Sequence, residues 1–423
     1  MSSAISHSNK TTQTDGPYRV MVVDDSAIIR GFLCRYLSED PNIDVVTTAN
    51  NGSVALRQLD LHDVEVVVLD IEMPVMDGLT ALPKMMDKKP DLQVVMASTL
   101  TRKNAEVSLR SLQMGAVDYV PKPETARSVN ANIDFRRELV EKVKAWASRR
   151  RTKINRASPA LAGSVISGST PAPRDGFVKP SRPQAPTGFV SAARPRPAPV
   201  ISSVRAATAT NINSDAANDT KLSLRKGSLR RPKILLIGSS TGGPQALMKF
   251  FAGFSKRPDV PILITQHMPA TFTAILADHL KQATGWDAEE AKDSTALMPG
   301  HIYVAPGGKH MEIVEENGKI ITRLTDDPPE NFCKPAVDPM FRSAARIYKD
   351  QILAVMLTGM GHDGLKGSRE ITKEGATLLA QDEETSVVWG MPGAVATAGL
   401  CTEILPITEL GAAASKRLQG AMM

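Results

Sequence analysis

The chain has 423 residues, of which 42% are hydrophobic, and a formal net charge of +6. This length accommodates two or three domains, and the composition excludes a wholly disordered chain. No apolar run approaches the roughly 20 residues that a membrane-spanning helix needs, so we expect no membrane insertion. Three scattered cysteines (Cys34, Cys333 and Cys401) form neither a metal-ligand pattern nor a disulfide framework, which favours a cytoplasmic protein.

The first domain is predicted at residues 18–148, after a polar segment, 1–17, that lacks the apolar centre of a signal peptide and is expected to be disordered. Apolar runs such as YRVMVVDD and VEVVVLD read as buried strands, and segments with helical apolar spacing separate them. Five strands that alternate with helices predict a parallel sheet with right-handed crossovers.

Polar residues follow the predicted strands of this domain. Asp24 and Asp25 end the first strand, Asp70 the third, Ser98 the fourth and Lys122 the fifth. Three carboxylates at one sheet edge would repel each other without a divalent cation, and oxygen-only ligands favour Mg²⁺. The nearby lysine could neutralise a phosphoryl group. An acidic pair or a lone aspartate could instead cap helices, but five such residues at strand ends disfavour that alternative.

These residues resemble a response-regulator receiver domain over the whole region. The resemblance implies that Asp70 accepts a phosphoryl group. It also implies that Asp24, Asp25, Asp70 and the backbone carbonyl of Glu72 bind Mg²⁺. Three further residues would respond to the phosphate: the switch hydroxyl Ser98, the switch aromatic Tyr119 and the phosphate-sensing Lys122.

A linker is predicted at residues 149–230. This segment is crowded with Pro, Ala, Ser and Arg, and its basic residues far outnumber its acidic ones. It has too few apolar residues to offset the entropy of ordering, which favours a flexible tether. Contact with nucleic acid or acidic lipid is the alternative, but no aromatic residues interleave with the basic ones to stack bases.

The second domain is predicted at residues 231–420. A buried strand, KILLIG, leads into the turn IGSSTGGPQAL and then a helix, for which Gly243 suits the cap and Pro244 the first position. Further strand patterns (VPILITQH, HIYVAPG, ILAVMLTG and ATLLAQD) alternate with helical ones. We therefore expect a doubly wound α/β domain.

The glycine-rich turn has three possible uses. It lacks the lysine of a Walker loop, and its glycines have the wrong spacing for a dinucleotide fingerprint, which disfavours phosphate binding. Gly238 to Gly242 has the G-x-S-x-G form that presents a serine, although a purely structural turn would explain the five residues alone. His267 ends the next strand, and Asp363 follows another strand in a glycine-lined loop. Together they predict that Ser240, His267 and Asp363 form a nucleophile, base and orienting acid.

The order Ser, His, Asp along the chain differs from that of α/β-hydrolases. The motifs GSSTGG, TQHMPATFT, YVAPGGKH, CKPAVDPMFRS, LTGMGHDG and VVWGMPGA resemble the chemotaxis protein-glutamate methylesterases, the CheB family, whose members join a receiver to this domain by a linker. The resemblance implies that Ser240 is the nucleophile, His267 the general base and acid, and Asp363 the orienting carboxylate. It also implies that the Met360 N–H supports the oxyanion, with Thr241 as a second contributor.

Two residues depart from the family pattern. Ser239 stands where alanine is common and offers a second hydroxyl, but the turn spacing selects Ser240. His362 stands where asparagine is usual and is a rival base, but its position next to Asp363 in sequence disfavours a triad. We therefore expect His267 to be the base.

The resemblance implies a hydrolase that demethylates glutamate γ-methyl esters on methyl-accepting chemotaxis receptors and deamidates specific receptor glutamines. Its phosphodonor would be the chemotaxis histidine kinase CheA, and the protein would be recruited to receptor arrays. Mg²⁺ would serve the receiver alone, with no cofactor for the ester chemistry. The alternatives are a catalytically silent receptor adaptor and a regulator with a nucleic-acid-binding output. The intact triad disfavours the first, and the concentration of basic residues in the linker disfavours the second.

Overall fold

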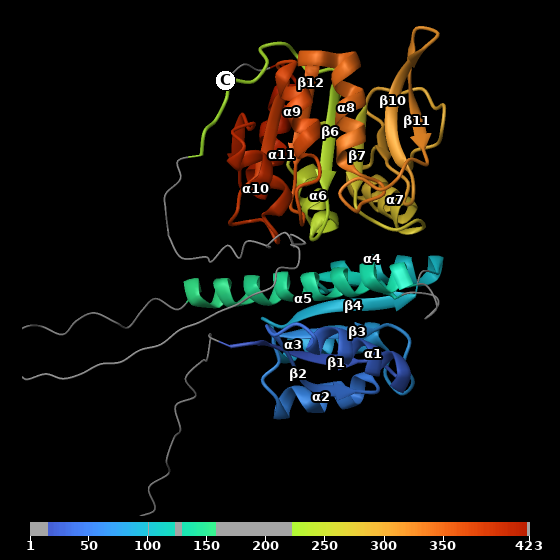
Figure 1. Ribbon diagram of the computed structural model, residues 1–423, viewed down its shortest axis with the longest axis vertical. Helices are drawn as coiled ribbons and strands as arrows, with labels where there is room; N and C mark the ends of the chain where they lie inside the picture. Colours follow the sequence, from blue (N-terminus) through green and yellow to red (C-terminus); the bar gives the residue numbers. More distant parts are fainter. Residues whose placement is uncertain (1–15, 100, 123–128, 158–221, 421–423) are drawn as a thin grey trace, which may run out of the picture. The chain divides into compact units, whose positions relative to one another are not determined.

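The computed structural model describes residues 16–99, 101–122, 129–157 and 222–420, so residues 1–15 of the predicted segment 1–17 and most of the predicted linker lie outside the described residues. The receiver region forms a five-stranded parallel sheet in the order β2-β1-β3-β4-β5 (Figure 1). Its strands are β1 (Tyr18–Val23), β2 (Ile43–Ala49), β3 (Val66–Asp70), β4 (Gln93–Thr99) and β5 (Asp118–Lys122). Its helices are α1 (Ala27–Ser38), α2 (Gly52–Leu61), α3 (Gly78–Lys88), α4 (Arg102–Gln113) and α5 (Val129–Ala157).

The receiver sheet is covered on both faces. Helices α1 and α5 pack together on one face, and α2, α3 and α4 on the other. Strand β3 is buried along its whole length, as expected for a central strand whose continuous VVVLD run faces apolar residues on both sides. Side-chain caps start several of the helices: Ser26, for example, accepts a hydrogen bond from the N–H of Ile29 at the start of α1. Helix α5 continues to Ala157 and so includes the first residues of the predicted linker.

The second region is built on a seven-stranded parallel sheet in the order β14-β13-β12-β6-β7-β9-β8. Its strands are β6 (Ile234–Ser239), β7 (Ile262–Gln266), β8 (Ala288–Glu290), β9 (Ile302–Val304), β12 (Ile352–Met356), β13 (Thr377–Gln381) and β14 (Glu403–Leu405). The helices are α6 (Gly243–Ala252), α7 (Phe272–Thr284), α8 (Val337–Tyr348), the 3₁₀ turn η1 (Lys349–Gln351), α9 (Leu365–Lys373), α10 (Gly390–Thr397) and α11 (Ile407–Leu418). The predicted fold class, a (βα)₅ receiver followed by a doubly wound α/β domain, is confirmed.

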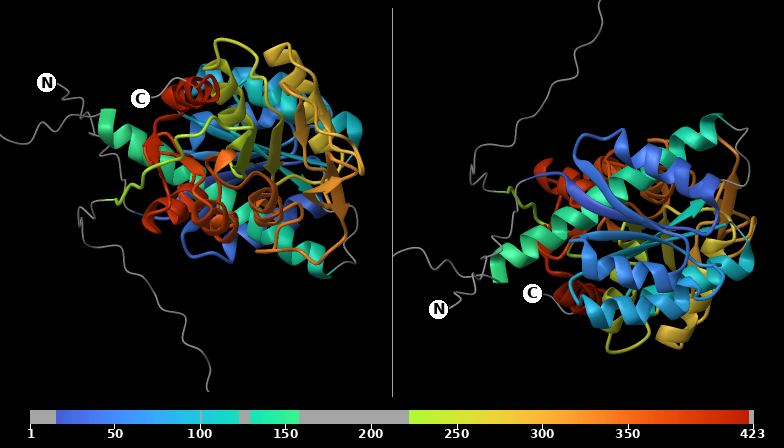
Figure 2. Two further views of the ribbon diagram at one scale, coloured as in Figure 1. Left: turned by 90° about the horizontal axis from the view of Figure 1, so that it is seen from above. Right: turned by 90° about the horizontal axis from the view of Figure 1, so that it is seen from below.

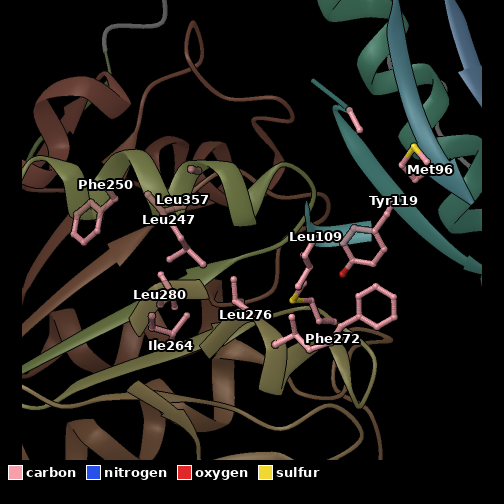
Figure 3. Packing of buried hydrophobic residues seen from close by; sticks show 14 of the residues in the cluster. Met96, Leu109, Tyr119, Leu247, Phe250, Ile264, Phe272, Leu276, Leu280 and Leu357 are labelled. Atoms are coloured by element: carbon pink, nitrogen blue, oxygen red, sulfur yellow. The ribbon is translucent and has the colours of Figure 1, made fainter. Parts of the chain in front are cut away.

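Two apolar layers sandwich this second sheet. Helices α6, α7 and α11 cover one face, where Leu247 and Phe250 of α6 pack with Ile264 of β7 and Leu276 and Leu280 of α7 (Figure 3). Helices α8, α9 and α10 cover the other face. Helix α6 begins at Gly243 with Gly242 as its cap, one residue earlier than predicted, because Gly242 already has the left-handed φ of 74°.

A separate hairpin stands beside the sheet and packs on α8. Strands β10 (His310–Glu316) and β11 (Lys319–Thr325) pair antiparallel across a two-residue turn (Figure 2). Asn317 and Gly318 in this turn have φ values of 50° and 70°, as a type I′ hairpin turn requires. The loop from 328 to 336 then leads from this hairpin into α8.

Candidate active site

The sheet register brings Ser240 and His267 to neighbouring positions. Strands β6 and β7 are adjacent and parallel, and Ser239 is paired with Gln266 at their ends. The next residues, Ser240 and His267, therefore leave the same edge of the sheet side by side. Strand β12 flanks β6 on its other side, and Asp363 lies in the loop that follows it. Residues from three separate parts of the sequence thus meet at the carboxyl edge of one sheet.

Glycines allow the turn after β6 to close tightly. A Cβ on Gly243 would collide with Oε1 of Gln266, and a Cβ on Gly242 would collide with Val387. Gly359, in the loop after β12, lies against Ser240, and a Cβ there would be 2.9 Å from the Cβ of Ser240. The Ser240 N–H donates to the carbonyl oxygen of Thr358 at 3.0 Å, which joins the two loops.

His267 and Asp363 form a close, largely buried pair. Nε2 of His267 lies 2.7 Å from Oδ2 of Asp363, and the two side chains are 12% and 2% exposed. Oδ2 of Asp363 also accepts from the N–H of Val337 at 2.6 Å, and Oδ1 accepts from the Asn331 amide at 2.9 Å. The Asp338 N–H donates a longer fourth bond to Oδ1 at 3.4 Å, so the carboxylate is held on both oxygens and orients the imidazole.

The same contacts set the protonation of the pair. Burial by itself raises the pKa of Asp363, but the hydrogen bond and charge of His267, together with the Val337 and Asn331 donors, lower it to about 2. Burial lowers the pKa of His267, but the Cys333 sulfur and the Asp363 carboxylate outweigh it and raise that pKa to about 10. The ion pair is thus the favoured state of the resting site.

Within the described part of the chain, no hydrogen bond joins the Ser240 hydroxyl to the His267 imidazole. Nε2 of His267 is engaged by Asp363, so Nδ1 is the nitrogen left to act as a base, and it lies 3.3 Å from Sγ of Cys333. The Ser240 side chain is half-buried, and its hydroxyl makes no hydrogen bond to any other described residue. Catalytic hydrogen bonds commonly tighten only when substrate binds, so this arrangement is compatible with a base next to the serine.

In the receiver region, the predicted acids and lysine converge. One carboxylate oxygen each from Asp24, Asp25 and Asp70 lie within 4.8 Å of one another. Nζ of Lys122 lies 2.6 Å from both Asp24 and Asp70. Burial and the Asp24 charge raise the pKa of Asp70, whereas Lys122 lowers it, and the net shift is upward. A cleft of about 540 Å³, lined in part by Asp25 and Glu72, adjoins the cluster. Three oxygen donors at an open cleft fit a hard divalent cation.

Two of the predicted switch residues of the receiver, Ser98 and Tyr119, contact side chains outside the acidic cluster. Oγ of Ser98 is 2.8 Å from Oγ of Ser108 on α4, and both hydroxyls are buried. The Tyr119 ring is buried and stacks on the Phe272 ring with a centroid distance of 4.6 Å. Burial raises the pKa of Tyr119 well above its ordinary value, so its hydroxyl stays protonated.

Comparison with known proteins follows the same division of the chain. The family model for the CheB methylesterase matches residues 235–414, and that for the response regulator receiver domain matches residues 20–134. The protein-glutamate methylesterase/protein-glutamine glutaminase 1 of Rhodospirillum rubrum is 48% identical over 96% of this chain and 97% of its own length. The chain belongs to the CheB methylesterase family.

This CheB chain is also similar to a second full-length relative and to one solved catalytic domain. The protein-glutamate methylesterase/protein-glutamine glutaminase 1 of Paramagnetospirillum magneticum is 47% identical over 93% of this chain and 94% of its own length. The crystal structure of the Thermotoga maritima CheB methylesterase catalytic domain is 39% identical, covers 44% of this chain and 98% of its own, and has a TM-score of 0.43. No helix among the described residues of the CheB chain is long and apolar enough to cross a membrane.

The two rival residues of this CheB chain, Ser239 and His362, have surroundings that differ from those of Ser240 and His267. The Ser239 hydroxyl is fully buried and donates to Oε1 of Gln266 at 2.7 Å. His362 is exposed, and among the described residues no hydrogen bond or ion pair joins its ring to Ser240 or Asp363. In contrast, the Met360 and Thr241 N–H groups make no hydrogen bond to other described residues, which leaves both free to donate.

Sequence reasoning missed several residues of the CheB site. Gln266 is buried, and its amide donates to the carbonyl oxygens of Ser240 at 2.9 Å and His267 at 3.2 Å, so it ties the two strand ends together. Its place before His267 in the TQHMP motif was the available signal. Asn331 and Cys333 come from the irregular 328–336 loop; Cys333 opens the CKPAVDPMFRS motif, but nothing in that motif indicates that its sulfur faces His267.

Proposed function

We propose that this chain hydrolyses glutamate γ-methyl esters and deamidates specific glutamines on methyl-accepting chemotaxis receptors, under control of phosphorylation at Asp70. The placement of Ser240 and His267 at adjacent strand ends, with Asp363 bonded to the imidazole, carries this proposal. Membership of the CheB family supports the substrate class. A catalytically silent adaptor would not need a buried acid and histidine held beside a half-exposed serine.

In the proposed reaction, Ser240 attacks the ester carbonyl and His267 accepts the hydroxyl proton on Nδ1. Asp363 stabilises the imidazolium through Nε2. The free N–H groups of Met360 and Thr241 would donate to the oxyanion, and each such donor typically contributes about 3 kcal/mol. His267 returns the proton to the departing methoxide, and methanol leaves. Water then attacks the acyl-enzyme with His267 again as base. A glutamine amide would release ammonia by the same steps.

For regulation, we propose that Asp24, Asp25 and Asp70, with the Glu72 carbonyl, hold Mg²⁺ while Asp70 receives a phosphoryl group from the kinase CheA. The cation would offset the negative charge that develops on the phosphoryl oxygens. Lys122 already bridges Asp24 and Asp70 and can move to the phosphate. Ser98 would leave Ser108 for a phosphate oxygen, which releases a hydrogen bond on α4.

Docking of the receiver on the esterase would couple phosphorylation of Asp70 to ester hydrolysis. The Tyr119–Phe272 stack joins β5 to α7, and the Gln245 amide donates to the Ala116 carbonyl oxygen at 3.0 Å. A change around Tyr119 on phosphorylation would weaken these contacts and open the esterase. We propose that the protein acts in the cytoplasm at receptor arrays.

Methanol release from receptor membranes that carry labelled methyl groups tests this function. Wild type and Ser240→Ala would each be assayed with and without a small-molecule phosphodonor and Mg²⁺. Release by wild type, stimulated by phosphodonor and absent in Ser240→Ala, is the expected result. Stoichiometric binding of those membranes without methanol release, even with phosphodonor, would instead indicate the silent adaptor.

A further inference from the structure

The 328–336 loop reaches the triad with a residue that the proposed mechanism does not use. The side-chain amide of Asn331 donates one hydrogen bond to Oδ1 of Asp363 at 2.9 Å and another to Oδ2 of Asp338 at 3.0 Å. Asp338 is fully buried at the start of α8, and Asp363 is 2% exposed. One amide group therefore bridges two buried carboxyl groups.

The two carboxyl groups would otherwise disfavour each other's charge. Asp338 also accepts from the N–H of Gly367 at 2.5 Å, and its own N–H donates to Oδ1 of Asp363 at 3.4 Å. Burial, reinforced by the charge of Asp363, raises the pKa of Asp338 to about 6. Like charges this close normally force one group to take up a proton. Hydrogen-bond donors decide which one stays charged, and Asp363 has more of them.

Other charged groups around the pair are already partnered. His267 faces Asp363, and Cys333 faces the other side of the imidazole. Arg342, one turn along α8 from Asp338, donates to Glu330 at 2.9 Å. Among the described residues, the Asn331 amide is thus the one side-chain donor that reaches both carboxyl groups.

The backbone holds Asn331 in a conformation that few residues adopt. Asn331 and Phe332 have φ values of 52° and 65°, in the left-handed region, where asparagine is better tolerated than most residues. Buried His310 secures both ends of the loop. Its Nδ1 accepts from the Ala336 N–H at 3.1 Å, so its Nε2 carries the proton and donates to the Pro328 carbonyl at 3.1 Å.

We propose that Asn331 is a positioning residue of the esterase, which keeps Asp363 charged and aimed at His267 by donating to Asp363 and Asp338 at once. This proposal rests on the triad roles proposed above. It adds a second buried acid, Asp338, to the groups that decide the charge of the site.

The test compares two substitutions that keep the left-handed backbone accessible. Asn331→Gly removes the amide, and Asn331→Asp replaces the donor by a third carboxylate. Asn317→Gly and Asn317→Asp are matched controls, because Asn317 has a φ of 50° in the exposed hairpin turn and lies away from the triad. Full-length proteins would be assayed with phosphodonor for methanol release from labelled receptor membranes between about pH 7 and pH 11.5, with the release by Ser240→Ala subtracted at each pH, and their thermal unfolding recorded.

Both Asn331 variants should lose about 10- to 100-fold in kcat with little change in KM, as expected when a catalytic group is misoriented. In Asn331→Asp the added negative charge should raise the pKa of His267, so the rise of kcat/KM with pH should move upward by about one unit. The Asn317 variants should match wild type. Coincident pH profiles for Asn331→Asp and wild type, or kcat values within twofold, would overturn the proposal. Wild type that releases no methanol would instead contradict the proposed function.

Discussion

Cys333 is the residue whose contact most affects the base. Its sulfur faces Nδ1 of His267, the nitrogen that we propose accepts the Ser240 proton, and helps to raise the pKa of the imidazole to about 10. A protonated imidazole cannot act as a base, so esterase activity should rise as the pH passes this pKa.

Cys333→Ala should therefore lower the pKa of His267 and move the rise of kcat/KM to lower pH, by about one unit. The measurement is the pH dependence of methanol release, with Cys34→Ala in the receiver as the matched control. An upward move, or none, would contradict the electrostatic role of the sulfur.

Ser239 and Ser240 have neighbouring hydroxyls with opposite surroundings. The Ser239 hydroxyl is buried against Gln266, whereas that of Ser240 is free to react. Ser239→Ala should leave Oε1 of Gln266 without its donor and cost about 1–3 kcal/mol of unfolding free energy. Its kcat should nevertheless remain within a few-fold of wild type, while Ser240→Ala loses activity. Loss of methanol release in Ser239→Ala with unchanged stability would reverse the assignment.

At the scale of elements, the turn from β6 into α6 depends on glycine for two separate reasons. Gly242 has a left-handed φ and also no room for a Cβ beside Val387, whereas Gly318 in the hairpin has φ of 70° and open space around it. Substitution of Gly318 therefore introduces backbone strain alone, whereas substitution of Gly242 introduces backbone strain and a collision.

Gly318→Ala should cost about 1 kcal/mol, from backbone strain alone, and leave activity unchanged. Gly242→Ala should be destabilised by several-fold more and should lose esterase activity, because the displaced turn carries Ser240 away from His267. Thermal unfolding and methanol release measure the two effects. Equal destabilisation of both variants would show that Val387 moves away from the added Cβ at no cost in stability.

Sequence patterns predicted the elements with strong periodicity and left out the weak ones. Runs such as ILLIG and ILAVM are short, continuously apolar and typical of strands buried on both faces, so β6 and β12 were predictable. Strands β8 and β14 have three residues each and carry no pattern. The β10–β11 hairpin was missed, although Asn317–Gly318 between alternating apolar residues is a hairpin signal.

Prediction of the site had a similar limit. Residues at strand ends, such as His267, could be placed because parallel strands end at one edge. Asn331 and Cys333 could not, because a loop without periodicity gives no indication of where its side chains point. Which imidazole nitrogen faces the acid likewise depends on packing that no sequence motif encodes.

At the scale of the whole molecule, control by Asp70 can be separated from catalysis. Asp70→Asn should leave the unstimulated esterase rate unchanged and abolish stimulation by phosphodonor, because the phosphoryl acceptor is lost. Asp44→Asn, an exposed acid of the same domain, should respond like wild type. Stimulation that survives in Asp70→Asn would place the phosphorylated residue elsewhere.

The long predicted linker should weaken inhibition by the receiver, because a longer tether lowers the effective concentration of one domain near the other. Deleting part of residues 158–221 should therefore lower the unstimulated esterase rate and increase the fold stimulation by phosphodonor. Methanol release before and after addition of phosphodonor measures both. Unchanged rates after the deletion would indicate that the tether does not limit docking.

The order of strands in the second sheet also bears on the life of the newly made chain. Ser240 and His267 leave the ribosome well before Asp363, and the strand that brings the acid to them, β12, pairs with β6 only after more than half of the domain has been synthesised. A nascent or truncated chain therefore carries Ser240 in its turn and His267, but not Asp363 to orient the imidazole. We therefore expect a chain that ends before Asp363 to hydrolyse no ester, even though it already contains the serine and the histidine.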